Sequence, residues 1–194
     1  MRNTEFDREK VLRAAITAFM SKGYNKTSMP DLTQATGLHP GSIYAAFKNK
    51  RGLLIAAIGQ YHLDRNTQFN HFFSGSGPIL KMLKDYLDNI VIECLSCDAA
   101  QACLHMKTLS EIAEQDEEIR DMVTENLTLS QEALATKFEQ AKARGELSTE
   151  RDSSHLARYF MMGAYGLRTY THMHLQPDTL QQLADQLYQD LCAA

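Results

Sequence analysis

The sequence predicts an all-α protein, and three observations support that fold class. The 194 residues include only 10 Gly and 4 Pro, too few to punctuate many short strands. Apolar residues recur at helical spacing along most of the chain, and no segment shows the alternation typical of a strand. Hydrophobic residues make up 44% of the chain and charged residues 23%, as in an ordinary folded globular protein.

The first expected helix covers residues 7–22. Its apolar residues share one face, and its charged residues occupy the other. Asp7 suits the first turn, where a carboxylate is favoured, and Gly23 suits the position just past the end. The apolar face consists of Val11, Leu12, Ala15, Ile16 and Phe19.

A short helix should follow over about residues 28–36. Thr27 or Ser28 can cap its start, and Pro30 falls in its first turn, where a missing N–H costs little. Gly37 tolerates the left-handed conformation that ends a helix.

A second short helix should begin at Pro40 and end at Phe47. It is too short to be stable alone, so Ile43 and Phe47 should turn inward and pack on its neighbours. Two short helices joined by a tight turn around a glycine form a helix-turn-helix, here at about residues 28–47.

The rest of the chain predicts longer helices, separated by Gly, Ser and Pro clusters such as SGSGP at residues 74–78. We therefore expect two domains, a DNA-binding domain at residues 1–51 and a helical effector-binding and dimerisation domain at residues 52–194. The later helices are expected at about residues 50–73, 78–96, 101–114, 117–144, 152–174 and 178–192.

Charge is distributed unevenly between these two parts. Residues 1–51 contain nine Lys or Arg against four Asp or Glu, a net charge of +5. The remainder contains 11 basic and 20 acidic residues, a net charge of −9. This asymmetry is typical of a polyanion-binding head on an acidic body.

The outward face of the second short helix predicts contact with DNA bases. It carries Gly41, Ser42, Tyr44 and Ala45, which are small or hydrogen-bonding residues without an acid to repel phosphate. Ala45 could meet a thymine methyl and Ser42 a base edge in the major groove. Residues at suitable spacing to reach phosphates flank this face: Thr27, His39, Lys48 and Lys50.

The segment TSMPDLTQATGLHPGSIYAAFKNKRGLL, with FMSKGYNKTSM before it, resembles the DNA-binding part of the TetR family of bacterial regulators. The resemblance covers about residues 7–56 and departs from the family at Thr33 and Thr36, where small alanines are usual. It implies that Tyr44, Lys50, Thr27 and Ser28 touch the DNA backbone. It also implies that Gly41, Ser42 and Ala45 face bases.

The same resemblance implies that the last two helices pair with their copies in a homodimer, which would read two half-sites related by twofold symmetry. An apolar stripe with two glycines that permit close helix approach agrees with this, although an ordinary monomer core is the alternative. The expected interface residues are Leu156, Tyr159, Phe160, Gly163, Gly166, Leu167, Tyr170, Leu183 and Leu187, with Leu180 and Leu191 on the same helix face.

A small-molecule effector would be enclosed by the helices from residue 78 to 144, and the alternative for each candidate contact, which the sequence favours, is a plain core residue. Cys103 stands near His105 and Lys107, which could lower its thiol pKa, so it is either a redox sensor or a buried structural thiol. The candidate pocket residues are Phe69, Phe72, Tyr86, Ile90, Cys103, Met106 and Phe138.

No metal, cofactor or enzymatic activity is expected. Cys94-x-x-Cys97 is only half of a zinc site, and the pair His172 and His174 lies far along the chain. No nucleotide-binding, hydrolase or di-iron motif occurs. No apolar run is long enough for a membrane span, and no signal peptide is visible, so we expect a cytoplasmic protein.

Two functions remain open at this point. The first is a transcriptional regulator, by family habit a repressor, which binds a palindromic operator in double-stranded DNA as a dimer and is released by a small molecule or an oxidant. The second is a TetR-like protein that is anchored on DNA but acts through protein–protein contacts without an effector.

Overall fold

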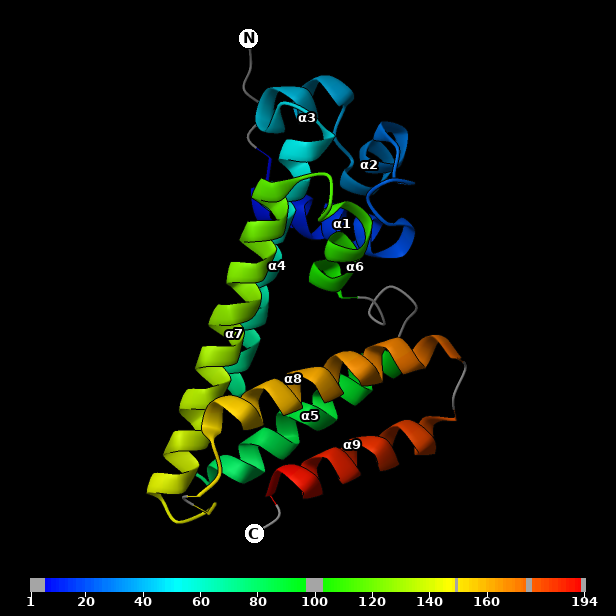
Figure 1. Cartoon of the computed structure of the whole chain (residues 1–194). Coiled ribbons are helices and arrows are strands. Elements are labelled where there is room, and N and C mark those ends of the chain that lie inside the picture. The colour runs from blue at the N-terminus through cyan, green and yellow to red at the C-terminus, as the bar shows by residue number, and fades with distance from the viewer. Residues whose placement is uncertain (1–5, 97–102, 149, 174–175, 193–194) are drawn as a thin grey trace. The chain divides into compact units, whose positions relative to one another are not determined.

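The computed structural model describes residues 6–96, 103–148, 150–173 and 176–192, and within these ranges the chain is entirely helical. The predicted all-α fold class is confirmed (Figure 1). The helices are α1 (Arg8–Lys22), α2 (Met29–Thr36), α3 (Pro40–Phe47), α4 (Lys50–Phe72), α5 (Ile79–Ser96), α6 (Leu104–Ile112), α7 (Glu117–Ala143), α8 (Ser153–Tyr170), a 3₁₀ turn (Thr171–Met173) and α9 (Pro177–Cys192).

The chain forms two compact units. The first combines the residues up to Arg65 with Leu104–Val123, and the second combines Asn66–Cys103 with the residues from Thr124 onward. Helix α6 therefore packs with the N-terminal helices, although the sequence places it in the middle of the chain. This division does not coincide with the expected boundary after residue 51.

The first unit is built around the helix-turn-helix that the sequence predicts. Ser28 caps α2 and forms a reciprocal capping box with Asp31, in which each side chain accepts the backbone N–H of the other residue. Gly37 ends α2 at a φ of 70°, in the left-handed region. The hydroxyls of Thr33 and Thr36 donate to carbonyls one turn earlier, so both threonines fit into α2 without disrupting it.

The second unit has its core between α5, α8, α9 and the C-terminal part of α7. Helices α8 and α9 approach closely at Gly163, where a Cβ atom would lie 2.3 Å from a methyl carbon of Leu187. The sequence predicted close helix packing at this glycine against a partner copy, whereas its neighbour in the protomer is α9 of the same chain.

None of the described helices combines the length and the apolar character that crossing a lipid bilayer requires.

Candidate DNA-binding interface

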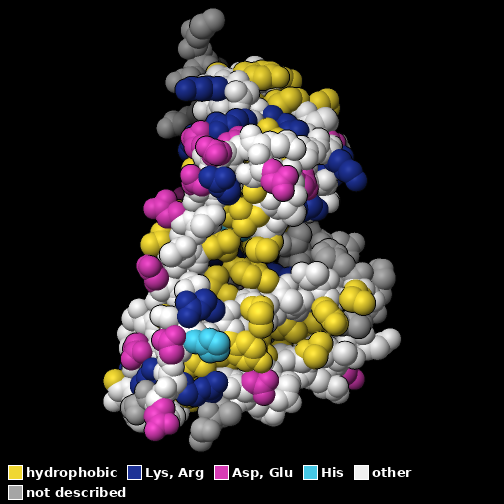
Figure 2. All heavy atoms as spheres, in the orientation of Figure 1, with side chains coloured by type: hydrophobic (Ala, Val, Ile, Leu, Met, Phe, Trp, Pro, Cys, Tyr) yellow, Lys and Arg dark blue, Asp and Glu magenta, His cyan; other side chains and the backbone are white. Residues whose placement is uncertain are grey.

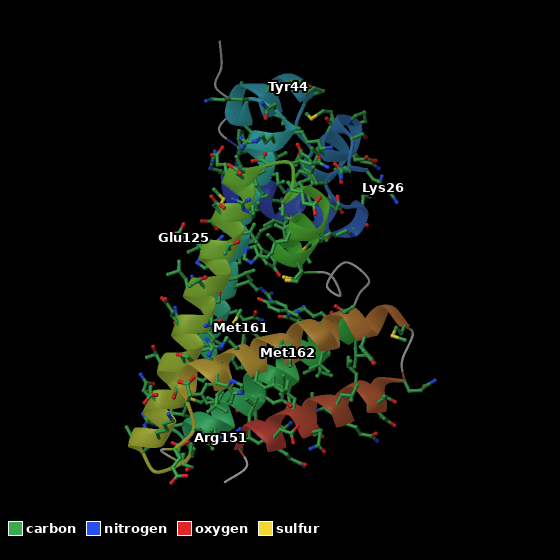
Figure 3. All side chains as sticks on the ribbon, in the orientation of Figure 1. Lys26, Tyr44, Glu125, Arg151, Met161 and Met162 are labelled. Carbon is green, nitrogen blue, oxygen red and sulfur yellow. The ribbon has the colours of Figure 1, made fainter. Side chains whose placement is uncertain are left out.

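Helix α3 separates a buried face from an exposed face, as its sequence predicts. Ile43 is fully buried and Phe47 is 4% exposed, whereas Tyr44 is 49% exposed and Ala45 is exposed. Tyr44 lies on the outer side of α3 (Figure 3). Over this helix, the face in Figure 2 shows hydrophobic side chains with basic side chains beside them. Helix α3 is therefore anchored by its buried residues, and its opposite face is accessible to a binding partner.

Gly41 and Ser42 complete this exposed face near the start of α3. Gly41 is exposed, and a Cβ atom placed there would meet nothing within 4 Å. Ser42 is half-buried, and its backbone N–H donates to the carbonyl of His39 at 2.9 Å. His39 precedes the helix and is exposed, and its side chain makes no capping hydrogen bond. The lack of a side chain at Gly41 is thus not required by packing within the protein.

The turn between α3 and α4 positions two lysines. Lys48 is exposed and has a φ of 69°, a positive value that is uncommon for a residue with a Cβ atom. Lys50 is the first residue of α4, and its Nζ lies 4.3 Å from the centre of the Tyr24 ring. Burial lowers the pKa of Lys50, and the negative charge of Glu111 opposes that effect.

Asn49 caps α4, a role that the sequence analysis missed. Its side-chain oxygen accepts the backbone N–H of Gly52 at 2.8 Å. The backbone N–H of Gly52 is therefore not free to bind a phosphate. Asparagine directly before a helical segment is a known capping signal, so the sequence contained the information.

Thr27 is a correction to the expected set of phosphate contacts. It is only 1% exposed, and its hydroxyl donates to the carbonyls of Gly23 and Ala18. Its backbone N–H also donates to Gly23, so Thr27 closes the turn after α1 and has no group left for DNA. Ser28 is exposed, but its hydroxyl donates to the Asp31 carboxylate at 2.6 Å.

Helix α6 holds the end of α1 through two charged side chains. Lys107 Nζ donates to the carbonyl of Met20 at 2.8 Å, and Glu111 accepts the backbone N–H of Asn25 at 2.9 Å. The Glu111 carboxylate occupies the space that a Cβ atom at Gly23 would need. Sequence reasoning missed this contact because more than 80 residues separate the partners.

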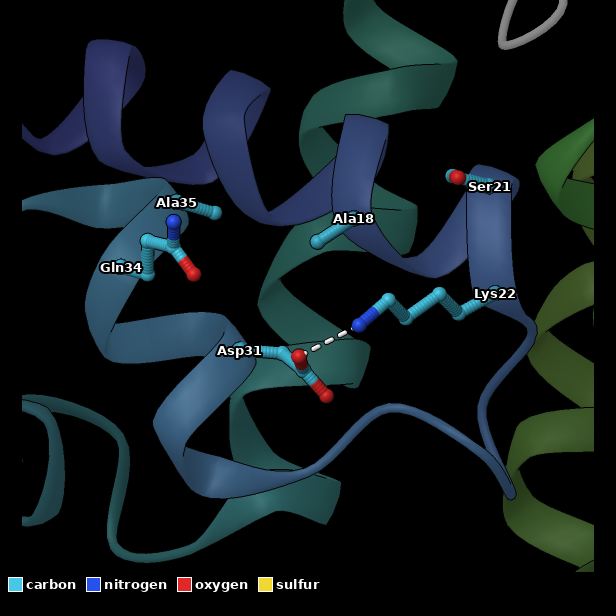
Figure 4. A pocket seen from close by; sticks show the side chains of 6 residues that line it. All are labelled: Ala18, Ser21, Lys22, Asp31, Gln34 and Ala35. Atoms are coloured by element: carbon cyan, nitrogen blue, oxygen red, sulfur yellow. Dashed lines mark hydrogen bonds and ion pairs between the residues drawn. The ribbon is translucent and has the colours of Figure 1, made fainter.

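A pocket of about 290 Å³ lies between α1 and α2, lined by Ala18, Ser21, Lys22, Asp31, Gln34 and Ala35 (Figure 4). Lys22 and Asp31 form an ion pair across it at 2.5 Å. That pair, with the capping hydrogen bonds from Ser28, holds the pKa of Asp31 well below its ordinary value. The pocket is thus crossed by an ion pair that joins the two helices.

In the second unit, three of the candidate effector residues form one aromatic group. The Tyr86 ring centre lies 5.5 Å from those of both Phe69 and Phe72. The group is partly buried and packs against the core, in which Ile90 and Phe138 are almost completely buried. Ile90 and Phe138 therefore belong to the hydrophobic core.

The remaining candidates for the effector pocket are placed differently. Met106 is 41% exposed and belongs to the first unit, whereas the aromatic group belongs to the second. Cys103 is half-buried and forms no disulfide. Beside the core, Arg168 pairs with Glu93 at 2.7 Å, and Glu93 also accepts a hydrogen bond from Asn89.

The Cys94-x-x-Cys97 and His172-x-His174 pairs lie only partly within the described residues. Cys94 is buried, and burial raises the pKa of its thiol. Cys97, His174 and the side chain of His172 lie outside the described residues. Within the described part of the chain, no group of metal-binding side chains comes together.

The expected dimer residues fall into two sets. Leu156, Phe160, Leu167 and Leu187 are core residues of the single protomer, so their assignment to a dimer interface was wrong. The stripe repeats at helical spacing, which does not tell an internal partner from an external one. The exposed set consists of Gly166, Tyr170 at 48% exposure and Leu183 at 42%. Tyr159 is half-buried and donates to Asp190, and Gly163 faces Leu187.

Two family models match this chain. Residues 11–57 match that of bacterial regulatory proteins of the tetR family, and residues 80–187 match the tetracyclin repressor-like C-terminal domain. The chain belongs to the TetR family. A TetR-family protein is a DNA-binding transcription regulator and not an enzyme, as the sequence predicts.

Curated TetR-family relatives are similar over most of their length. The HTH-type transcriptional repressor ComR of Escherichia coli (strain K12) is 27% identical over 181 residues, which is 92% of this chain and 86% of ComR. The uncharacterized HTH-type transcriptional regulator YezE of Bacillus subtilis (strain 168) is 28% identical over 185 residues, 95% of each chain.

Solved TetR-family structures share the fold. A regulator from Chloroflexus aurantiacus J-10-FL superposes with a TM-score of 0.84 at 23% identity, covering 96% of this chain and 94% of the other. A cysteine mutant of the TetR-family regulator CifR, solved with double-strand operator DNA, also gives a TM-score of 0.84, at 24% identity and coverages of 97% and 98%.

Proposed function

We propose that this TetR-family regulator is a cytoplasmic repressor that binds a palindromic operator as a homodimer and is released by a small-molecule or redox signal. The observation that carries the proposal is the exposed face of α3, where Gly41, Ser42, Tyr44 and Ala45 stand outward over buried Ile43 and Phe47. A helix with small outward residues can lie deep in the major groove. The name of ComR as a repressor supports the direction of regulation.

We assign base contacts to Gly41, Ser42 and Ala45 and backbone contacts to Ser28, His39, Tyr44, Lys48 and Lys50. Phosphate contacts fix the register of the protein on DNA, whereas contacts to base edges select the sequence. Two such heads in a symmetric dimer would read half-sites one helical turn apart, about 34 Å.

For the signal, we propose that the aromatic group of Phe69, Phe72 and Tyr86 contacts a small apolar or aromatic effector. These side chains are only partly buried in the protomer, so they retain surface that a ligand could cover. Cys103 is the alternative sensor, and two similar structures involve cysteine substitution or a redox state. CifR was solved with cysteines replaced, and NemR of E. coli was solved in a reduced form.

A selection from randomised duplexes with the purified protein tests the DNA-binding part of the proposal. We expect an inverted repeat with half-sites about 10 base pairs apart between centres. Ser42→Ala should change the preference at particular positions of each half-site, and Lys50→Ala should not. Selection of no sequence at all, or of a single half-site, would contradict the proposal.

Release is tested on the selected operator with wild-type protein and Cys103→Ser. Release by an aromatic compound in both proteins supports an effector, and release by peroxide in the wild type alone supports the thiol. The second candidate function, a DNA-anchored protein–protein interaction factor, would bind the operator and respond to neither.

A further inference from the structure

The basic residues of the N-terminal segment differ in whether a carboxylate already neutralises them. Arg13 pairs with Glu9 and Asp64, Lys22 pairs with Asp31, and Arg51 pairs with Asp116 and Glu118. Within the described residues, no acid forms an ion pair with Arg8, Lys10, Lys26, Lys48 or Lys50. Figure 3 shows Lys26 on the turn between α1 and α2. Among the described basic residues of this segment, the second set is the one that no carboxylate engages in an ion pair.

Arg8 is distinguished within that set by its contact with α3. Its guanidinium carbon lies 5.0 Å from the centre of the Phe47 ring, and the Phe6 ring lies 6.3 Å from the same ring. Phe47 is the last residue of α3 and is almost completely buried. The first residue of α1 is thereby placed at the C-terminal end of α3, which Lys48 follows directly in the chain.

The contact with Phe47 fixes Arg8 without using its hydrogen-bond donors. A guanidinium over an aromatic face is attracted through its plane and keeps the N–H groups at its edge free. Arg8 is exposed, and its neighbour Asp7 is committed to capping α1 by accepting the N–H of Lys10 at 3.0 Å. The N–H groups of a guanidinium that is already held in position can donate to a phosphate. Binding then loses less conformational entropy than it would with a freely moving side chain.

We propose that Arg8, which lies outside the helix-turn-helix, binds a DNA phosphate at the edge of the groove that α3 occupies, and that Phe47 holds it in position. This proposal rests on the proposed DNA-binding role of α3. It adds a contact from the start of α1 to those expected from α2, α3 and the start of α4.

The test compares Arg8→Gln with Lys10→Gln in the full-length protein on the selected operator. Lys10 is also exposed, and it lies two residues along the helix, about 200° around its axis from Arg8. Fluorescence anisotropy between 50 and 300 mM salt gives the slope of log association constant against log salt. We expect Arg8→Gln to reduce the slope by about one unit per protomer and Lys10→Gln to leave it unchanged.

A charge-preserving variant separates a phosphate contact from a folding defect. Arg8→Lys should restore most of the slope, because charge alone determines counterion release. A double-mutant cycle of Arg8→Gln with Phe47→Leu should be non-additive, since loss of the ring releases the guanidinium. The melting temperature of each variant identifies any that is unfolded.

Equal slopes for Arg8→Gln and the wild type, or a change only in base preference, would overturn the proposal. Arg8→Lys behaving like Arg8→Gln would also overturn it. These failures differ from failure of the proposed function, in which the wild-type protein itself would bind no operator.

Discussion

The Lys50 ammonium lies 4.3 Å above the centre of the Tyr24 ring, which joins the first residue of α4 to the turn that follows α1. Glu111 of α6 accepts the N–H of Asn25 in that same turn. One charge of the candidate DNA-binding surface is therefore positioned by three segments that are distant in the sequence.

Lys50→Ala should weaken binding to all duplexes alike, because a phosphate contact carries no sequence information. We expect the slope of log association constant against log salt to fall by about one unit per protomer. Arg51→Gln is the control, since Asp116 and Glu118 already neutralise Arg51, and it should leave the slope unchanged. A Lys50→Ala protein with altered base preference but the wild-type slope would contradict the phosphate assignment.

Gly41→Ala should separate stability from DNA binding. The added methyl group meets nothing within 4 Å in the free protein, and alanine is favoured over glycine in a helix by up to about 1 kcal/mol. The variant should therefore melt at the same or a higher temperature. In a tight groove contact the same methyl group would be overpacked, at a cost of about 1–3 kcal/mol, which is a loss of affinity of roughly 5-fold to 150-fold. Unchanged affinity would show that α3 does not approach the bases closely at Gly41.

Gly52 and Gly59 provide a matched pair within α4. A Cβ atom at Gly52 would lie 2.0 Å from the carbonyl oxygen of Phe47, whereas one at Gly59 meets nothing within 4 Å. Gly52→Ala should lower the free energy of unfolding by about 1–3 kcal/mol, because backbone must move to relieve the clash. Gly59→Ala should raise it by up to about 1 kcal/mol. Chemical denaturation checks both, and equal effects would contradict a tight α3–α4 turn.

The sequence was most informative where the determining interactions are local. Helical spacing alone was enough to assign Ile43 and Phe47 to the buried side of α3. The position of Gly37 directly after a short helix was enough to predict that it ends α2. Thr27 and Ser28 are both good capping residues, and only the fold decides that Ser28 caps and that Thr27 is buried.

Long-range contacts were not predictable in the same way. The clamp of Lys107 and Glu111 on the end of α1 depends on how α6 folds back, which no local pattern encodes. The stripe on α8 showed that a helix packs closely against it, but not that Leu187 of the same chain fills the space at Gly163.

His105 should make stability depend on pH. It is 4% exposed, its Nε2 is buried without a hydrogen-bond partner, and the rings of Tyr61 and His62 lie 5.0 and 6.3 Å away. Burial, with the charges of His62 and Arg65, lowers the pKa of His105 from 6.5 to about 4. The unfolded chain therefore binds a proton at a higher pH than the folded protein does.

The resulting stabilisation is complete above about pH 6.5 and is lost as the pH falls towards 4, by up to about 3 kcal/mol. His105→Gln removes this proton uptake, so the difference in free energy of unfolding between wild type and variant should shrink across that range. Urea denaturation at pH 7.5, 6 and 5 measures the difference. Parallel pH profiles for the two proteins would show that His105 is not buried in its neutral form.

Leu183→Arg should dissociate the proposed dimer without unfolding the protomer. Leu183 on α9 is 42% exposed, and on α8 Met162 and Tyr170 are 63% and 48% exposed, an apolar surface that the protomer leaves uncovered. Burying an unpaired charge in such an interface should raise the dimer dissociation constant about 100-fold or more. Light scattering after gel filtration measures the mass of the particle. The affinity for an inverted repeat should fall when the dimer dissociates.

Leu129→Arg on α7 is the matched control, because Leu129 is 47% exposed but is not on α8 or α9. If both variants stay dimeric, the dimer forms through another surface, and if both dissociate, the effect is not specific to this interface.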